Sequence, residues 1–419
     1  MGEIARCCGD GNRGMLSRKR AFGLIAAIVV GLIAEALIAR STLYGHGTLT
    51  LGQGMMARDF GDFWSAGHLA WAGRVRIIFQ PSLFQHWLEG RFTFVHGARM
   101  WSYPPSMVFL VLPVGLVGPV AGFVLWTALG MAALAGALAL LVPRRDFGPA
   151  ALLVCMLPVV WDNILAGQNA AFTGAMLIAG FVWLDRRPGW AGVAFGLLTI
   201  KPQLGLLVPL ALLAAGRWRA IGIAALVAVG LAGLSALVFP GSWTMFFAHV
   251  ATAMQHRLLR HYLPTPGQAY MSSAFIAAEG ARFPIWAAWA TQGLVTMLAS
   301  VAMVRLWRRT PASSTARLWR IVASVALCLA ASPYGLDYDA VGGGLALAAL
   351  IVTQGQSLRR DRFEVGLVAI ATPGWSLVLA EVFHVPVFAW IPWLILGCWE
   401  AFAPEQNHRA PAISTGEAR

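Results

Sequence analysis

The sequence predicts an all-α, polytopic transmembrane helix bundle of about 10–12 spans with two long outer loops. Three observations predict it. Of the 419 residues, 58% are hydrophobic and only 12% are charged, whereas soluble domains average about 25% charged residues. The apolar residues form blocks of about 17–25 residues, the length that a helix needs to cross a bilayer. Unbroken apolar runs such as 131–142 suit a helix, which satisfies its own backbone hydrogen bonds in lipid.

The predicted spans follow one another along almost the whole chain, so residues 21–402 are expected to form one transmembrane domain. They are 21–39, 103–142 (one long span or two short ones), 150–166, 170–184, 190–200, 204–215, 221–238, 284–306, 318–331, 340–352, 365–382 and 387–398. The first block lacks a small-residue cleavage site, so it is predicted to be a retained span. Residues 1–20 are predicted to be a basic cytoplasmic N-terminus, and 403–419 a disordered cytoplasmic tail.

Arginine clusters between the apolar blocks predict the orientation, because short cytoplasmic loops are enriched in Arg and Lys. Residues 13–20, 186–187, 217–219, 308–309 and 359–362 are therefore expected to be cytoplasmic. The connections between them face outward. Two of these, 40–102 and 240–283, are too long for turns, and long loops of this kind usually carry function. The same placement accounts for the net charge of +13, so nucleic-acid binding is not expected.

The first outer loop carries two candidate catalytic acids, Asp59 and Asp62. Positions three residues apart share one face of a helix. A carboxylate at an apolar interface can have a raised pKa and serve as a general base. A helix cap explains the same pattern equally well.

Polar residues also interrupt the apolar blocks at helix junctions. The amides of Gln168 and Asn169 could bind sugar hydroxyls or simply join helices. Lys201 is one of only two lysines, and it is followed by Pro202 and Gln203. Its charge could hold a phosphate, or its side chain could extend to the membrane surface.

The remaining candidates lie in two outer connections. The second long loop contains the basic residues His249, His256, Arg257, Arg260 and His261, which could bind a phosphate or move a proton, or only form a solvated face. The turn at 332–339 adds carboxylates, which could be helix caps. These residues and the acids of the first loop all fall on the predicted outer face, which favours chemistry at the lipid–water boundary. The chain has no Walker motif, no Gly-x-Ser-x-Gly elbow and no zinc-ligand spacing.

Five short motifs occur in a fixed order along the chain. They are Asp59-Phe60-x-x-Phe63-Trp64-x-Ala66-Gly67, Tyr103-Pro104-Pro105, Gly167-Gln168-Asn169, Lys201-Pro202-Gln203, and Ser332-Pro333 with Tyr338-Asp339. As a set, spanning about 21–401, they resemble glycosyltransferase family 87. That family comprises integral membrane enzymes of the C-type glycosyltransferase superfamily, including polyprenyl-phosphate-mannose-dependent α-mannosyltransferases.

The resemblance implies a C-type glycosyltransferase architecture in the inner (plasma) membrane, with the active site on the extracytoplasmic side. A sugar, with mannose as the best-known case, would move from a polyprenyl phosphate to an envelope glycolipid or glycan by an inverting displacement. Asp59 would be the base and Asp62 a second acid, with neither metal nor cofactor. The residues expected to hold the donor phosphate are Lys201, His256, Arg257 and Arg260. Those expected to contact substrate are Tyr103, Gln168, Asn169, Gln203, His261, Tyr338 and Asp339.

Two other functions remain open. A transporter or flippase for lipid-linked sugars would use the same cavity without bond chemistry. The long outer loops, the absence of an inverted repeat and the scarcity of charge at mid-span argue against it. A structural subunit of an envelope complex would explain the hydrophobicity but not the acids, histidines and lysine on one face.

Overall fold

The computed structural model describes residues 16–44, 58–92, 99–254, 271–383 and 385–403. These residues form helices, with one isolated bridge between Met271 and Leu336 as the only strand-like pairing among them. The all-α polytopic bundle predicted from the apolar blocks is therefore confirmed. The α-helices are α1 (Arg18–Tyr44), α2 (Arg58–Trp71), α3 (Val75–Ile78), α4 (Pro81–Glu89), α5 (Val108–Gly115), α6 (Pro119–Leu141), α7 (Arg144–Met156), α8 (Pro158–Ala166), α9 (Ala170–Trp183), α10 (Pro188–Leu197), α11 (Val208–Ala214), α12 (Trp218–Val238), α13 (Ser242–Met245), α16 (Ala274–Gly280), α17 (Ile285–Arg308), α18 (Ser314–Ala331), α19 (Val341–Gln354), α20 (Arg360–Phe383) and α21 (Trp390–Phe402).

Short tight turns connect several of these helices. They are the 3-10 turns η1 (Pro105–Met107), η2 (Leu198–Ile200), η3 (Pro202–Gly205), η5 (Asp337–Ala340) and η6 (Gly355–Ser357), and the π-helical turn η4 (Phe246–Ala251).

Five helices of the described residues are long and apolar enough to cross a membrane: α1, α6, α12, α17 and α18. The bent pair α7–α8 makes a sixth if it is one span. Other predicted spans form shorter apolar helices, including α9 and the segments Pro188–Ile200 and Pro202–Ala214. The bundle therefore combines a few full-length helices with several shorter ones.

Prolines decide where two of the predicted apolar segments break. The segment 103–142 forms two helices, α5 and α6, separated at Leu116–Gly118 and restarted by Pro119. The segment 150–166, predicted as one span, is instead bent by 59° between α7 and α8. Pro158 begins α8, and a proline cannot donate the backbone hydrogen bond that would continue α7.

The centre of the bundle is formed by α18, α19 and α9. Within an 18-residue stretch of each helix, 83% of the residues are buried in α18 but only 6% in α12, which lies at the edge of the bundle and packs on α10. Small residues allow the central helices to approach closely. A Cβ atom added at Gly174 of α9 would lie 2.9 Å from Gly342 of α19.

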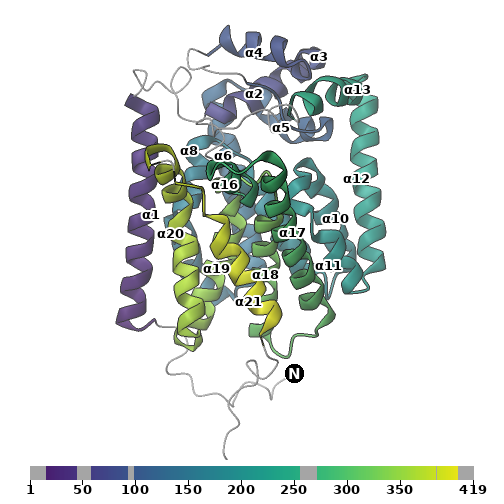
Figure 1. Cartoon of the computed structure of the whole chain (residues 1–419). Helices are drawn as coiled ribbons and strands as arrows, with labels where there is room; N and C mark the ends of the chain where they lie inside the picture. Colours follow the sequence, from purple (N-terminus) through teal and green to yellow (C-terminus); the bar gives the residue numbers. More distant parts are fainter. Residues whose placement is uncertain (1–15, 45–57, 93–98, 255–270, 384, 404–419) are drawn as a thin grey trace, which may run out of the picture.

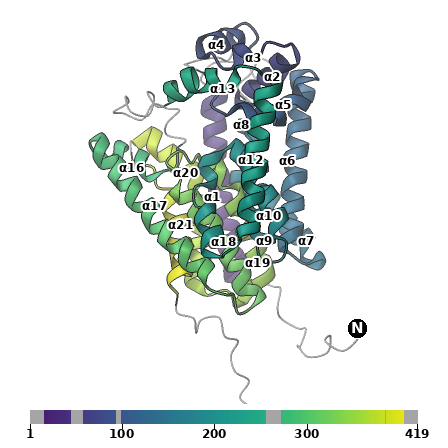
Figure 2. The same cartoon turned by 90° about the vertical axis from the view of Figure 1, so that its right-hand side faces the viewer.

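One end of the bundle is covered by short helices from the two long predicted loops. Figures 1 and 2 both place α2, α3, α4 and α13 at this end, which we call the loop end. The helix α2 packs directly on α5, where a Cβ atom at Gly115 would lie 2.2 Å from the backbone of Gly67. This contact fixes α2, and with it the predicted catalytic acids, against the membrane helices.

Candidate active site

One arginine holds both acids of the first loop. Asp59 and Asp62 lie one turn apart in α2 and accept hydrogen bonds from the same guanidinium group, that of Arg99. The Nη2 atom lies 2.9 Å from Asp59 and 2.7 Å from Asp62, and the Nε atom donates a further bond of 3.1 Å to Asp62. Burial lowers the pKa of Arg99, but the charges of Asp62 and Asp59 outweigh that effect and raise it above its ordinary value. The Arg99 guanidinium therefore keeps its positive charge beside the two carboxyl groups.

The second oxygen of Asp59 is fixed by Gln168. The Nε2 atom of Gln168 donates to Asp59 over 2.8 Å, and the Oε1 atom accepts from the hydroxyl of Tyr103 over 3.2 Å. The indole of Trp126 donates to the backbone carbonyl of Gln168 over 3.1 Å. Gly167 ends α8 with a positive φ of 72°, a conformation that suits glycine, and so turns the amide toward α2. Asp59 is thus oriented from two sides.

A buried ion pair, Lys201–Asp339, lies next to these polar groups. Lys201 is 1% exposed, and its Nζ atom lies 2.5 Å from Asp339 and 3.5 Å from the amide oxygen of Asn169. The ammonium also lies 5.0 Å from the ring centre of Tyr338, a distance suited to a cation–π contact. The other oxygen of Asp339 accepts from the backbone of Leu336 and so caps η5. Lys201 therefore points into the protein and does not extend to the membrane surface.

Tyr103 couples the two clusters. Burial raises the pKa of its phenol well above the ordinary value, and the charges of Asp339, Asp59 and Asp62 raise it further. Its hydroxyl donates to Gln168 of the first cluster, and the next residue along the chain, Asn169, contacts Lys201 of the second. The motifs from α2, the α8–α9 junction, the α10–α11 junction and η5 therefore meet in one polar interior.

The structure brings together most of the residues predicted from the sequence. Asp59, Asp62, Tyr103 and Gln168 form the first cluster, and Asn169, Lys201, Tyr338 and Asp339 form the second. Gln203 lies half-buried in η3, and within the described residues its side chain joins neither cluster by a hydrogen bond. His256, Arg257, Arg260 and His261 lie outside the described residues.

Three charged residues of this region were not predicted. Arg99 follows a long loop segment, and nothing in its sequence context pairs it with α2. Glu35 and Asp162 lie in apolar helices and are only 4% and 7% exposed. An ionisable residue inside an apolar block is a recognisable functional signal, so these two acids could have been found from the sequence.

The described part of the chain contains no group of three or more His, Cys, Asp or Glu side chains placed to hold a metal ion. What it does offer is an oriented carboxylate, fixed positive charges and amide groups. Such an arrangement can remove a proton from a hydroxyl and stabilise negative charge on a departing group.

Comparison with known proteins agrees with this chemistry. The model of glycosyltransferase family 87 matches residues 101–333, which is more than half of the chain. No curated protein and no solved structure matches the chain. The matched region contains the motifs at Tyr103, Gln168 and Lys201 and ends at the Ser332-Pro333 pair. The resemblance predicted from the ordered motifs is confirmed: the chain belongs to glycosyltransferase family 87 and is a membrane glycosyltransferase.

Proposed function

We propose that the protein transfers a sugar from a polyprenyl-phosphate donor to a hydroxyl of an envelope glycolipid or glycan at the loop end, facing the outside of the inner membrane. Mannose is the first sugar to test, because the family resemblance points to it. The observation that carries the proposal is the oriented carboxylate of Asp59, held by Arg99 and Gln168 beside membrane helices. A lipid-borne donor would reach this end from within the bilayer.

In the proposed reaction, Asp59 accepts the proton of the acceptor hydroxyl. The oxygen attacks the anomeric carbon, and the bond from that carbon to the phosphate oxygen breaks. The polyprenyl phosphate leaves with the bonding electron pair, and a single displacement of this kind inverts the anomeric centre. The hydrogen bonds from Arg99 and Gln168 favour the ionised form of Asp59, which is the form that a base requires.

Positive charge near the leaving phosphate would stabilise the transition state. Lys201 is the predicted cation within the described residues, and its charge is matched by Asp339 at 2.5 Å. We propose that Lys201, together with His256, Arg257 and Arg260 of the second loop, holds the donor phosphate. Tyr103, Gln168, Asn169, Gln203, His261, Tyr338 and Asp339 are the proposed contacts to the sugars. The reaction as proposed needs neither metal nor cofactor.

The test is a transfer assay with purified protein in lipid. A panel of polyprenyl-phosphate sugars is incubated with an envelope extract, and released polyprenyl phosphate and new glycosides are measured by mass spectrometry. We expect Asp59→Asn to lower turnover by about 10²–10⁴-fold, the usual contribution of a general base. The melting temperature should change little, because an amide can still bind Arg99 with one oxygen.

The matched control is Asp361→Asn in α20, an acid paired with Arg359 away from the loop end. This variant should keep wild-type turnover. Near-normal turnover by folded Asp59→Asn would show that another group is the base. Movement of an unchanged lipid-linked sugar across liposomes, without any new glycoside, would favour the flippase instead.

A further inference from the structure

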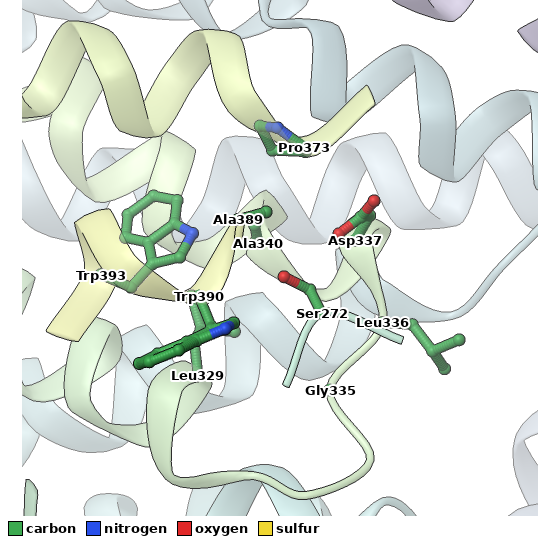
Figure 3. A pocket seen from close by; sticks show the side chains of 10 residues that line it. All are labelled: Ser272, Leu329, Gly335, Leu336, Asp337, Ala340, Pro373, Ala389, Trp390 and Trp393. Carbon is green, nitrogen blue, oxygen red and sulfur yellow. The ribbon is translucent and has the colours of Figure 1, made fainter. Parts of the chain in front are cut away.

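A small pocket is lined in part by η5, the turn that also carries Asp339. It is lined by Ser272, Leu329, Gly335, Leu336, Asp337, Ala340, Pro373, Ala389, Trp390 and Trp393. Figure 3 shows the side chains of Asp337 and Ser272 near one another, with the two indoles on the opposite wall. The pocket and the candidate active site therefore share one turn, in which Asp337 and Asp339 are only two residues apart.

The polar atoms of this pocket have no partners among the described residues. Both carboxylate oxygens of Asp337, the hydroxyl of Ser272 and the indole nitrogen of Trp390 are buried without a hydrogen bond. Asp337 as a whole is only 3% exposed. Buried polar groups are nearly always paired, because an unpaired one costs free energy. Three unpaired groups around one pocket therefore indicate a site for something that pairs with all of them.

The three groups are complementary to a hydroxyl. A carboxylate accepts a hydrogen bond, an indole N–H donates one, and the hydroxyl of serine can do either. A hydroxyl of a ligand can donate to Asp337 while it accepts from Trp390. The flanking indole of Trp393 adds an apolar wall, and aromatic surfaces beside a few oriented polar groups are typical of small-molecule sites. The enclosed space is about the size of one water molecule, so it suits a single hydroxyl of a larger ligand such as a carbohydrate.

The pocket is not sealed from its surroundings. Ser272, Leu336 and Trp390 are each partly exposed, although the polar atoms of Ser272 and Trp390 are buried, and Asp337 lies at the buried end. A second carboxyl group lies behind the wall, since Glu35 of α1 approaches Gly374, the neighbour of the lining residue Pro373. Burial raises the pKa of Asp337 well above its ordinary value and the charge of Asp162 raises it further, whereas the nearby hydroxyl of Ser272 lowers it in part. A protonated Asp337 could also donate a hydrogen bond to a hydroxyl, so the match holds in either form.

We infer that this pocket is a subsite that anchors a hydroxyl of the carbohydrate acceptor, distinct from the hydroxyl that reacts. The inference rests on the proposed transferase function. Asp337 and Trp390 act as positioning residues, because they hold the acceptor while Asp59 removes the proton elsewhere. Placing the anchor on η5 links acceptor binding to the turn that carries the partner of Lys201.

The direct test observes the pocket itself. Full-length protein labelled with 5-fluorotryptophan is studied by fluorine NMR in phosphatidylcholine nanodiscs, and the Trp390→Phe variant assigns the resonance of Trp390. The probes are glycerol, myo-inositol and methyl α-D-mannopyranoside, with tetrahydropyran as a ring without hydroxyls. We expect at least one polyol to shift the Trp390 resonance in a saturable manner and tetrahydropyran to leave it unchanged.

Variants separate binding in the pocket from unspecific effects. Asp337→Leu should weaken the response to the polyol by about tenfold, because leucine neither accepts nor donates a hydrogen bond and so removes the interaction in either protonation state. The control Asp361→Leu should leave the response unchanged. No saturable shift with any polyol, or an undiminished shift in Asp337→Leu, would overturn the inference and leave the pocket as a site for an ordered water only.

A kinetic test distinguishes this inference from the proposed function. In the transfer assay with varied amounts of envelope extract, Asp337→Leu and Ser272→Ala should raise the apparent KM for the extract by about tenfold and change kcat by less than about threefold, which is the signature of lost substrate binding. Trp286→Phe, an exposed tryptophan in α17, is the control for substitution of an indole. A fall of kcat by about tenfold with an unchanged KM would overturn the anchoring role. Saturable polyol binding without transfer by the wild type would contradict the proposed transferase function but not the binding of hydroxyls in the pocket.

Discussion

The two ends of the molecule differ in how their carboxyl groups are paired with arginines. At the end opposite the loop end, Asp185 contacts Arg217 over 3.1 Å and also binds Arg320, and Glu400 pairs with Arg362 over 2.8 Å. At the loop end, one arginine serves both Asp59 and Asp62. The carboxylate of Asp337 has no hydrogen-bond partner among the described residues.

The difference indicates that the ion pairs at the end opposite the loop end serve stability, whereas the acids at the loop end serve function. Surplus arginine at one end is what the predicted placement of positive charge on the cytoplasmic side would produce. Surplus acid at the other end is costly for folding, and such costs persist mainly at functional sites. The following substitutions test this contrast.

The largest effect on folding is expected from breaking the buried pair at the loop end. Lys201→Met leaves Asp339 buried without its cation, and removal of one partner of such a pair typically costs about 3–5 kcal/mol of unfolding free energy. Lys201→Met/Asp339→Leu should recover most of that stability without recovering transfer. Melting temperature and turnover are measured on the same preparations.

The matched pair at the opposite end sharpens this test. Arg362 and Glu400 are each 6% exposed, so their burial is similar. Arg362→Met/Glu400→Leu should be nearly neutral for stability and should keep wild-type turnover. Loss of transfer in this variant as well would show that the two ends are not functionally distinct.

A smaller loss of stability is expected at Asp185. Asp185→Asn removes the one carboxylate among three arginines, Arg217, Arg317 and Arg320. Loss of hydrogen bonds between charged groups suggests a cost of about 1.5–3 kcal/mol, and added salt should relieve part of the remaining repulsion. Turnover per folded molecule should stay unchanged, and a fall comparable to that of Asp59→Asn would contradict a purely structural role.

The loop-end half also contains a carboxyl group that should make stability depend on pH. Burial raises the pKa of Glu279 in α16 from 4.5 to about 7. A raised pKa means that the folded chain binds this proton more tightly than the unfolded chain does. Its stabilising contribution is therefore complete below the ordinary pKa and is lost as the pH rises through about 7. Thermal melting across this range should show a decline in wild type relative to Glu279→Gln; parallel curves would contradict it.

Most of the features that distinguish the two ends could be predicted from the sequence, but some could not. Apolar blocks and arginine clusters predicted the helices because both are local properties. The bend at Pro158 could also have been predicted, since proline cannot continue a helix. The contact of Arg99 with α2 could not, because it joins residues 37 and 40 positions apart across a long loop. Pairings of this kind depend on the packing of α2 against α5, which no local pattern specifies.

In the candidate site, too, some features could be predicted from the sequence and others could not. Asp59, Gln168 and Lys201 were identifiable as polar residues in apolar surroundings, where each must have a reason to be present. Their order of contact was not predictable: Gln168 binds Asp59, whereas its neighbour Asn169 faces Lys201. The left-handed turn at Gly167 sends adjacent amides to different partners. Residue type therefore indicated the chemistry, and backbone geometry determined which partner each side chain contacts.

The smallest effect is expected from Tyr103→Phe. This change removes the hydrogen bond of 3.2 Å to Gln168 and keeps the ring, which packs 5.4 Å from Phe63 between centroids. One neutral hydrogen bond is worth about 0.5–1.5 kcal/mol, so turnover should fall by about two- to tenfold through looser positioning of Gln168 and Asp59. The rate with Tyr103→Phe/Gln168→Ala should match that of Gln168→Ala alone, because both changes act on one path to Asp59. Additive losses in this cycle would instead mean that the hydroxyl of Tyr103 contacts substrate itself, as its place between the two clusters also allows.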